Sequence, residues 1–348
     1  MPDPFDQNAL IDQLEVYLLG EEPTLSGNDL ADEVGIPFEV ARQRWRSLGF
    51  TEVGADVKAF THADLEALRL TQRLSELGFL EPDEESALVR SLGRSFARLA
   101  EWQMGLLAKR IDLDTMELDE IAALMDEIVP AIESLQSYVW RRHTLGVGAR
   151  LLHSALLESD ADEGAADGAD SAETSEVDDD ATTMGVGFAD IVNYTQQSRS
   201  LSRSELTHLI DEFESRALEI VSEHGGRIIK TIGDEILLVA DDAAAIARIG
   251  LELIEEPERK DDFPELRVGL AWGPALSRLG DVLGPVVNIA SRLTSTSRPG
   301  RVLVDKALAD ELDGDDAFKL RRLRRTSVRG YRRLEPWALQ RAKDNGGL

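Results

Sequence analysis

The sequence predicts an α+β protein, in which an all-helical region is followed by a region that mixes strands and helices. Residues 1 to about 155 repeat apolar side chains at helical spacing. Residues 184–342 instead carry short apolar runs, bounded by Gly and Pro, that alternate with amphipathic segments. Between them, residues 158–183 contain no Lys or Arg and almost no large apolar side chain. The pattern therefore predicts two domains, 1–157 and 184–348, joined by an acidic flexible linker.

Composition limits the classes of function. The formal net charge of -28 disfavours general nucleic-acid binding, which depends on neutralising phosphates. The absence of cysteine excludes disulfides, zinc–thiolate sites and thiol nucleophiles. No apolar run approaches the roughly 20 residues that span a bilayer, and Met1–Asp6 does not resemble the start of a secretory signal. We expect a cytoplasmic protein with no membrane partner.

The helical region begins with the pattern of a helix-turn-helix. Ser26–Pro37 reads as a helix with a Gly-containing turn, and a second helix starts at Phe38. Its three arginines, Arg42, Arg44 and Arg46, occupy positions that a DNA reader uses. The alternative is a helical packing unit, which the acidic surroundings favour.

Longer helices follow, and Gly78, Pro82 and Pro130 are expected to separate them. Near the end of this region, His143 and His153 are candidate pH sensors or ordinary helix histidines. The predicted helices are 62–78, 83–110, 117–128 and 130–155.

The second region predicts the element order β-α-β-β-α-β, which is the ferredoxin-like unit. Such a unit is an antiparallel sheet with helices on one face, so its other face must be covered or must meet a partner. The predicted elements are strand 184–191, helix 202–224, strand–turn–strand 227–240, helix 242–256, strands 266–273 and 276–283, helix 285–297, strand 301–305, a short helix 306–312, and strands near 318–329 and 336–341.

Two carboxylates stand where apolar strands end. Asp234 follows Gly233 in the turn of the 227–240 hairpin, and Asp190 closes the strand 184–191. If these strands are neighbours, the two carboxylates converge. Convergent carboxylates suit Mg²⁺ or Mn²⁺, and a pair of such ions is the usual device for displacement at phosphorus.

A second informative stretch is Gly280–Leu293, where Gly284-Pro285 makes a turn and starts a helix. Asn288 and Arg292 are four residues apart and so lie on one helix face. Together they suit charge that develops on phosphate and ribose oxygens. The alternative is an amphipathic helix with a solvated arginine.

Three motifs in this order resemble the catalytic domain of class III adenylate cyclases, over residues 184 to about 342. The resemblance implies that Asp190 and Asp234, with the Ile191 carbonyl, hold two Mg²⁺ or Mn²⁺ ions per site. It also implies an adenine-selecting pair, a transition-state pair, and a basic residue for the terminal phosphates where the family usually has Lys. The motifs are Phe188-Ala189-Asp190-Ile191, Lys230-Thr231-Ile232-Gly233-Asp234, and Asp281 with Asn288-Ile289-Ala290-Ser291-Arg292. The implied adenine-selecting pair is Lys230 with Asp281, and the implied transition-state pair is Asn288 with Arg292. The implied basic residue for the terminal phosphates is Arg329.

The chemistry of the purine ring agrees with the implied adenine pair. Lys230 can donate to a ring nitrogen, and Asp281 can accept from an exocyclic amine but repels the guanine carbonyl. The expected reaction is attack of the ribose 3′-hydroxyl of ATP on the α-phosphorus, giving 3′,5′-cyclic AMP and pyrophosphate. In this family the site lies between two catalytic domains, and because this chain carries every group, a homodimer forms two complete sites.

The combination of the two regions also resembles actinobacterial soluble cyclases in which a helical domain restrains the catalytic domain. The resemblance implies autoinhibition, relieved by a small effector such as a proton or a lipid. Two alternatives stay open: a helix-turn-helix regulator with a catalytically silent nucleotide-sensing domain, and a guanylate- or diguanylate-type cyclase. The diguanylate signature has Gly where this chain has Ile232.

The basic run Lys319–Arg325 has three interpretations. It can supply a positive field near the triphosphate, it can bind the acidic linker, or it can be a solvated pair of strands.

Overall fold

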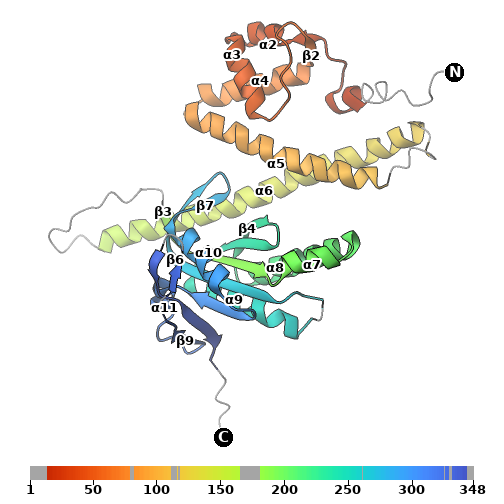
Figure 1. Cartoon of the computed structure of the whole chain (residues 1–348). Helices are drawn as coiled ribbons and strands as arrows, with labels where there is room; N and C mark the ends of the chain where they lie inside the picture. The colour runs from red at the N-terminus through yellow and green to blue at the C-terminus, as the bar shows by residue number, and fades with distance from the viewer. Residues whose placement is uncertain are drawn as a thin grey trace. The chain divides into compact units, whose positions relative to one another are not determined.

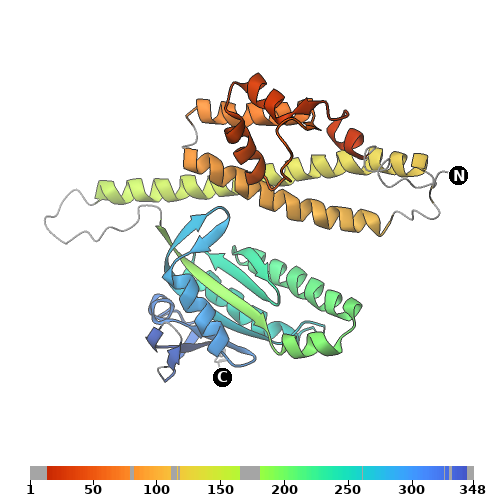
Figure 2. The same cartoon turned by 45° about the horizontal axis from the view of Figure 1, so that its top comes forward.

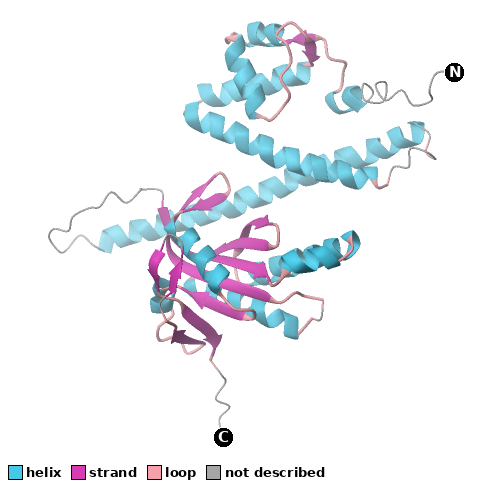
Figure 3. Ribbon diagram, viewed as in Figure 1, coloured by secondary structure: helices cyan, strands magenta, loops and turns pink. Residues whose placement is uncertain are grey.

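The computed structural model describes residues 14–78, 82–110, 116, 118–164, 181–260, 262–324, 326–328 and 331–342. The chain forms two compact units, Met1–Ala172 and Glu173–Leu348, which are described separately. Figure 1 labels their helices and strands, and Figure 3 distinguishes the helical first unit from the mixed second unit. This division of secondary structure confirms the predicted fold class.

The first unit is built mainly from helices. A compact helix-turn-helix is followed by progressively longer helices. In chain order the elements are β1 (Leu25–Ser26), α2 (Gly27–Val34), α3 (Phe38–Ser47), β2 (Lys58–Phe60), α4 (His62–Glu76), α5 (Pro82–Ala108) and α6 (Leu118–Gly164).

Local sequence explains the helix-turn-helix. Ser26 caps α2, accepting from the Asp29 backbone N–H while the Asp29 carboxylate accepts from the Ser26 N–H. Gly35 ends the helix with φ 72°, a left-handed conformation that glycine adopts without a steric cost. Trp45 of α3 then packs edge-on against Phe60, with ring centroids 4.7 Å apart. The helix-turn-helix predicted from the sequence is therefore present.

The structure differs from the prediction for this unit at three places. A short antiparallel pair, β1 with β2, adds strand structure to a region that was predicted to be all helical, because strands of two and three residues are too short to show alternation. Pro130 does not separate two helices but lies inside α6. A proline removes one helical hydrogen bond, and here the helix continues through it. The helix also runs to Gly164, into the segment predicted as linker.

The second unit is organised around one mixed sheet. Its strand order is β4-β5-β3-β6-β8-β12-β9, with β7 added to β6. The strands are β3 (Ala181–Ile191), β4 (Arg227–Ile232), β5 (Glu235–Ala240), β6 (Leu266–Arg278), β7 (Asp281–Leu283), β8 (Arg301–Val304), β9 (Phe318–Arg322) and β12 (Trp337–Arg341); β10 (Thr326–Val328) pairs separately with β11 (Tyr331–Leu334).

Helices cover both faces of this sheet. Alternate strand residues point to opposite faces, so Ala189 and Ile191 join one core while Val186 and Phe188 join another. The first core contains residues of α8 (Arg203–Glu223) and α9 (Ala243–Glu255), and the second contains residues of α10 (Pro285–Thr296). Figure 2 shows α10 crossing the sheet. The remaining helices are α7 (Tyr194–Ser200) and α11 (Lys306–Glu311), with a short 3-10 turn at Glu256–Glu258.

A glycine sets the position of α10. A Cβ at Gly269 of β6 would lie 2.2 Å from the Thr294 backbone nitrogen, so only glycine permits this approach. The Thr294 hydroxyl bonds to the Phe188 carbonyl at 3.2 Å, which fixes the helix over β3. The face of α10 that carries Asn288 is thereby held in a defined place.

The strands predicted at 266–273 and 276–283 are wrong in their boundary. The structure has one long strand, β6, which continues through Gly273-Pro274 and pairs with β3 as far as Leu276. The hairpin turn comes later, at Leu279 and Gly280, which both have positive φ (54° and 77°). That combination is the two-residue turn that matches the twist of a hairpin. Within the described residues, no helix is both long and apolar enough to cross a membrane.

Candidate functional site

Asp190 and Asp234 are brought together by the central hairpin. In β5, Glu235 pairs directly with Asp190 of the neighbouring strand β3. Gly233, with φ 68°, makes the turn that presents Asp234. The Ile191 backbone N–H donates to the Asp234 carbonyl at 3.1 Å, which joins the end of β3 to the turn. The convergence of the two carboxylates, which the sequence predicted only if the strands were neighbours, therefore follows from the strand order.

The site is electrostatically strained around Asp190, which is 8% exposed. Its Oδ2 accepts from Arg267 Nε at 2.5 Å, and Arg267 lies directly opposite on β6. Burial raises the pKa of Asp190, Arg267 opposes the rise, and the neighbouring Asp234 carboxylate adds to it. Two adjacent carboxylates with only one cationic partner would be stabilised by a further positive charge.

The donor set fits a hard divalent cation. Asp190 and Asp234 offer carboxylate oxygens, and the chain contains no thiol. Among the described residues, no group of three or more His, Asp or Glu side chains is placed to hold a metal ion. Mg²⁺ is commonly bound by one or two carboxylates, with waters and substrate phosphates filling its other positions. The residues therefore fit an ion that is shared with a phosphorylated substrate.

Glu235 gives a test of this electrostatic picture. Burial first, and then the charges of Asp190 and Asp234, raise its pKa to about 7. Between pH 4.5 and 7 the native state therefore keeps a proton on Glu235 that the unfolded chain has lost. The stability that this proton contributes is complete below pH 4.5 and is lost as pH rises through 7. We expect Glu235→Gln to stabilise the metal-free protein by about 1–3 kcal/mol at pH 8 and by little at pH 4.5, in urea unfolding.

The control is Glu223→Gln, which removes an exposed carboxylate from α8. It should change the free energy of unfolding by less than about 0.5 kcal/mol at either pH. An equal effect of Glu235→Gln at both pH values would contradict the inferred repulsion.

Lys230 and Asp281, predicted as a purine-recognition pair, are bonded to each other. The Lys230 Nζ of β4 lies 2.5 Å from the Asp281 Oδ2 of β7, although the residues are 51 positions apart. The other Asp281 oxygen accepts from the Val282 N–H at 2.9 Å. Burial acts to raise the pKa of Asp281, but Lys230 and the Val282 N–H together bring it below its usual value. Both side chains stay more than a third exposed, so a ligand can reach them.

Asn288 and Arg292 lie on the outer face of α10. The buried residues of this helix include Val286, Ala290 and Leu293, and Asn288 is exposed while Arg292 is half-buried. Within the described part of the chain, neither side chain makes a hydrogen bond or an ion pair. Among the described residues, the side chain that binds Asp190 is that of Arg267, not that of Asn288 or Arg292. An unpaired amide and guanidinium on one exposed helix face are available to a second molecule.

Residues 177–341 match the family described as the adenylate and guanylate cyclase catalytic domain. Among curated relatives, an adenylate cyclase of Glutamicibacter nicotianae is 36% identical over 96% of this chain and 83% of its own length. An adenylate cyclase of Streptomyces coelicolor is 33% identical over 99% of this chain and 94% of its own. A pH-sensitive adenylate cyclase of Mycobacterium tuberculosis is 32% identical over 91% and 79%. The chain belongs to the class III adenylate and guanylate cyclase family.

Sequence reasoning missed two groups at this cyclase site. Arg267 and Glu235 flank Asp190 on the two neighbouring strands, and only the strand order reveals it. The sequence did offer a signal for them, since Arg267 and Glu235 are charged residues within apolar strands. The same signal had singled out Lys230. Arg329 lies outside the described residues, so its role stays a prediction.

The three arginines of the cyclase's helix-turn-helix are engaged by neighbouring carboxylates. Each predicted basic residue is paired inside the first unit: Arg42 with Glu39, Arg44 with Glu85 at 2.7 Å, and Arg46 with Glu52 at 3.4 Å. If these arginines left their glutamates to bind DNA, the freed carboxylates would lie close to the DNA phosphates and repel them. This arrangement favours the packing-unit interpretation.

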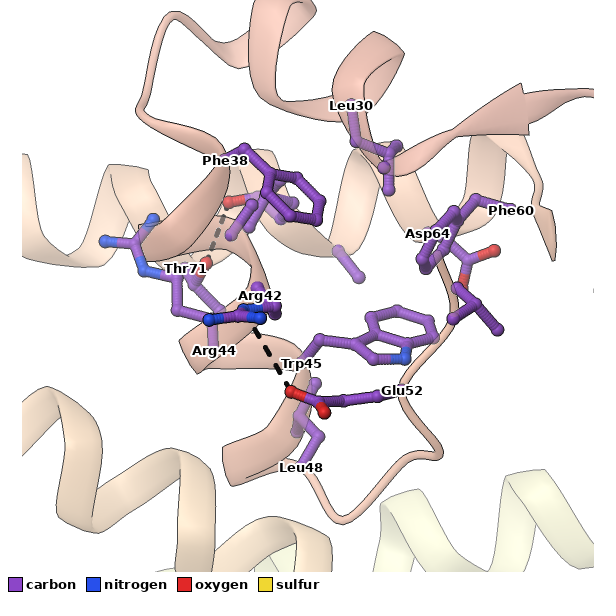
Figure 4. Close-up of a pocket in the computed structure, with 15 residues that line it drawn as sticks. Leu30, Phe38, Arg42, Arg44, Trp45, Leu48, Glu52, Phe60, Asp64 and Thr71 are labelled. Carbon is purple, nitrogen blue, oxygen red and sulfur yellow. Dashed lines mark hydrogen bonds and ion pairs between the residues drawn. The ribbon is translucent and has the colours of Figure 1, made fainter. Parts of the chain in front are cut away.

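A pocket lies between α2, α3 and α4 of the cyclase's first unit (Figure 4). Apolar side chains such as Leu30, Phe38 and Trp45 line it, and an ion pair of Arg42 with Glu52 lies at one side. Its free volume of about 50 Å³ has room for one or two waters. The pocket is thus too small, in this conformation, for a lipid chain. His143 is exposed on α6, and its predicted role as a pH sensor stays untested.

Proposed function

We propose that this protein is an adenylate cyclase that converts ATP to 3′,5′-cyclic AMP and pyrophosphate. The observation that carries the choice of substrate is the Lys230–Asp281 pair, which is exposed at the edge of the sheet. The family's description covers both adenylate and guanylate cyclases, so the groups that contact the base must choose between them. Relatives named adenylate cyclases match nearly the whole chain, which supports the same choice.

Adenine recognition follows from donor and acceptor matching. The Lys230 ammonium donates to a ring nitrogen of adenine, and the Asp281 carboxylate accepts from the exocyclic amine. Guanine carries a carbonyl oxygen where adenine carries that amine, and an ionised carboxylate repels it. Because the pKa of Asp281 is lowered, its carboxylate is ionised at neutral pH and the repulsion operates there.

Catalysis is assigned to groups that meet the ribose and phosphates. Asp190 and Asp234, with the Ile191 carbonyl, would hold two Mg²⁺ or Mn²⁺ ions, which supply Lewis-acid activation of the 3′-hydroxyl and neutralise phosphate charge. The 3′-oxygen bonds to the α-phosphorus while the bond from that phosphorus to pyrophosphate breaks, and the hydroxyl proton passes to solvent. Asn288 orients the ribose and Arg292 stabilises charge on the phosphorus centre. Arg329 binds the terminal phosphates.

Each site is shared between two copies of the chain. The proposal is supported by the state of α10, on which Asn288 is exposed and, among the described residues, neither Asn288 nor Arg292 bonds to a carboxylate of its own chain. A twofold dimer that brings this face against Asp190 and Asp234 of the partner makes two identical sites. Both halves of each site then come from residues that one chain already carries.

The test of the function is direct. Full-length protein is incubated with ATP or GTP and either Mg²⁺ or Mn²⁺, and cyclic nucleotide and pyrophosphate are measured together. We expect cyclic AMP and pyrophosphate in equal amounts, with kcat/KM for ATP at least about 100-fold above that for GTP. A preference for GTP, or binding without turnover, would contradict the proposal.

The helical unit is proposed to restrain the cyclase unit, with a proton or a small lipid as effector. The support is that adenylate cyclases match this chain over nearly its whole length, helical unit included, and that one of them is named pH-sensitive. Activity of the whole chain and of residues 173–348 is compared between pH 5.5 and 8. The proposal expects the shorter chain to be more active at the pH where the whole chain is least active. Equal or lower activity at every pH contradicts it, provided that the shorter chain unfolds cooperatively.

A further inference from the structure

A basic pocket lies beyond the C-terminal end of α10. It has a volume of about 360 Å³, and four arginines line it: Arg298, Arg301, Arg321 and Arg324. Thr296 adds a hydroxyl, and Leu303 contributes apolar surface. All of them belong to the second unit. We call this set of six residues the arginine pocket.

Three of the four arginines in this pocket have no acidic partner among the described residues. In the part of the chain that the structure describes, the guanidinium groups of Arg298, Arg301 and Arg321 form no ion pair, whereas the adjacent Arg322 binds Glu335 at 2.7 Å. Arginines gathered in one concavity repel one another unless an anion joins them. Guanidinium groups match phosphate oxygens with paired hydrogen bonds.

The position of the pocket connects it to the proposed catalytic face. Thr296 lies four residues after Arg292, so the pocket begins one helical turn farther along the same face of α10. Leu303 packs with Leu293 of α10, which puts the pocket on the α10 side of the sheet. The stripe from Asn288 through Arg292 therefore leads directly into the arginine pocket.

We propose that the arginine pocket binds phosphate oxyanions at the pyrophosphate end of the reaction. The inference rests on the proposed function, because the proposed reaction supplies the phosphate ligand. It deepens that function by adding Arg298, Arg301 and Arg321 to the proposed site. Arg292 contacts the phosphorus under attack, and the charge that leaves it moves toward the pocket. The ligand chemistry is that of a di- or triphosphate, either the tail of bound ATP or free pyrophosphate.

The test uses the double variant Arg298→Gln/Arg321→Gln in the full-length protein. Both residues are exposed, so the substitution removes charge without emptying the core. The control is Arg203→Gln/Arg248→Gln, which removes the same charge from α8 and α9 on the opposite face of the sheet. Binding of inorganic pyrophosphate is measured by calorimetry without divalent ions, and KM and kcat for ATP are measured with them. Thermal unfolding midpoints establish that both variants are folded.

We expect the pocket variant to bind pyrophosphate at least about tenfold more weakly than the control. If KM for ATP rises by a similar factor, the pocket holds the substrate's phosphate tail; if KM is unchanged, it holds the released product. Pyrophosphate affinity and KM that both equal those of the control overturn the proposal. Wild-type protein that binds pyrophosphate in this pocket but makes no cyclic AMP would overturn the proposed function and leave the pocket standing.

Discussion

Asp234→Ala reduces kcat/KM for cyclic AMP formation by at least about 1,000-fold, the largest effect expected of any single substitution in this protein. The side chain is half-buried at the hairpin turn, beside Asp190, and it is proposed to hold both ions against the phosphates. Removing it leaves the substrate phosphates without most of their neutralising charge. The measurement is initial rate against ATP concentration at saturating Mn²⁺, followed by chromatography of cyclic AMP.

Asp241→Ala is the matched control for this prediction. Asp241 follows the other end of the same strand, β5, and its carboxylate is exposed and paired with Arg227. It should keep activity within about twofold, because surface ion pairs contribute little to stability. Activity of Asp234→Ala within tenfold of wild type would remove the metal role assigned to that carboxylate.

Lys230→Met is expected to lower kcat/KM for ATP by about 100-fold. The substitution keeps an unbranched side chain but removes the donor to the purine and leaves Asp281 without its partner. Stability should change by less than about 1 kcal/mol, because the ion pair is more than a third exposed on both sides. Rates are measured with ATP and GTP, and unfolding is measured in urea.

Arg227→Met is the control for Lys230→Met. Arg227 lies three residues earlier on the same strand and makes a similarly exposed ion pair, at 2.9 Å, with Asp241. It loses a cation and a salt bridge but no purine contact. The two variants should therefore differ about 100-fold in ATP turnover while matching in stability. Equal activity of the two would assign Lys230 a purely structural role.

The elements that were predicted well from the sequence are those whose boundaries are marked by neighbouring residues such as glycine or proline. The strand ending at Asp190 and the hairpin around Gly233-Asp234 are short apolar runs bounded by glycine, and both form as predicted. The helix after Gly284-Pro285 starts where proline is tolerated. In each case the residues next to the boundary decide the conformation, so the pattern along the chain suffices.

The predictions that were wrong depend on packing across the chain. Pro130 and Gly273-Pro274 look like breaks, but tertiary context carries a helix through one and a strand through the other. Arg267 could not be assigned to Asp190 without the register of β3 against β6, and those residues are 77 positions apart. The coverage of the second sheet face by α10 likewise follows from the close approach at Gly269.

The central claim is that each catalytic site is shared between two chains, and one mixing experiment tests it. Asp190→Ala and Asn288→Ala chains, each inactive alone, are co-expressed in equal amounts with different tags. Random pairing makes half of the dimers mixed, and each mixed dimer has one site that carries neither substitution, so activity should recover to about a quarter of wild type. Mixed dimers, verified by sequential purification on both tags, that make no cyclic AMP would contradict the shared site.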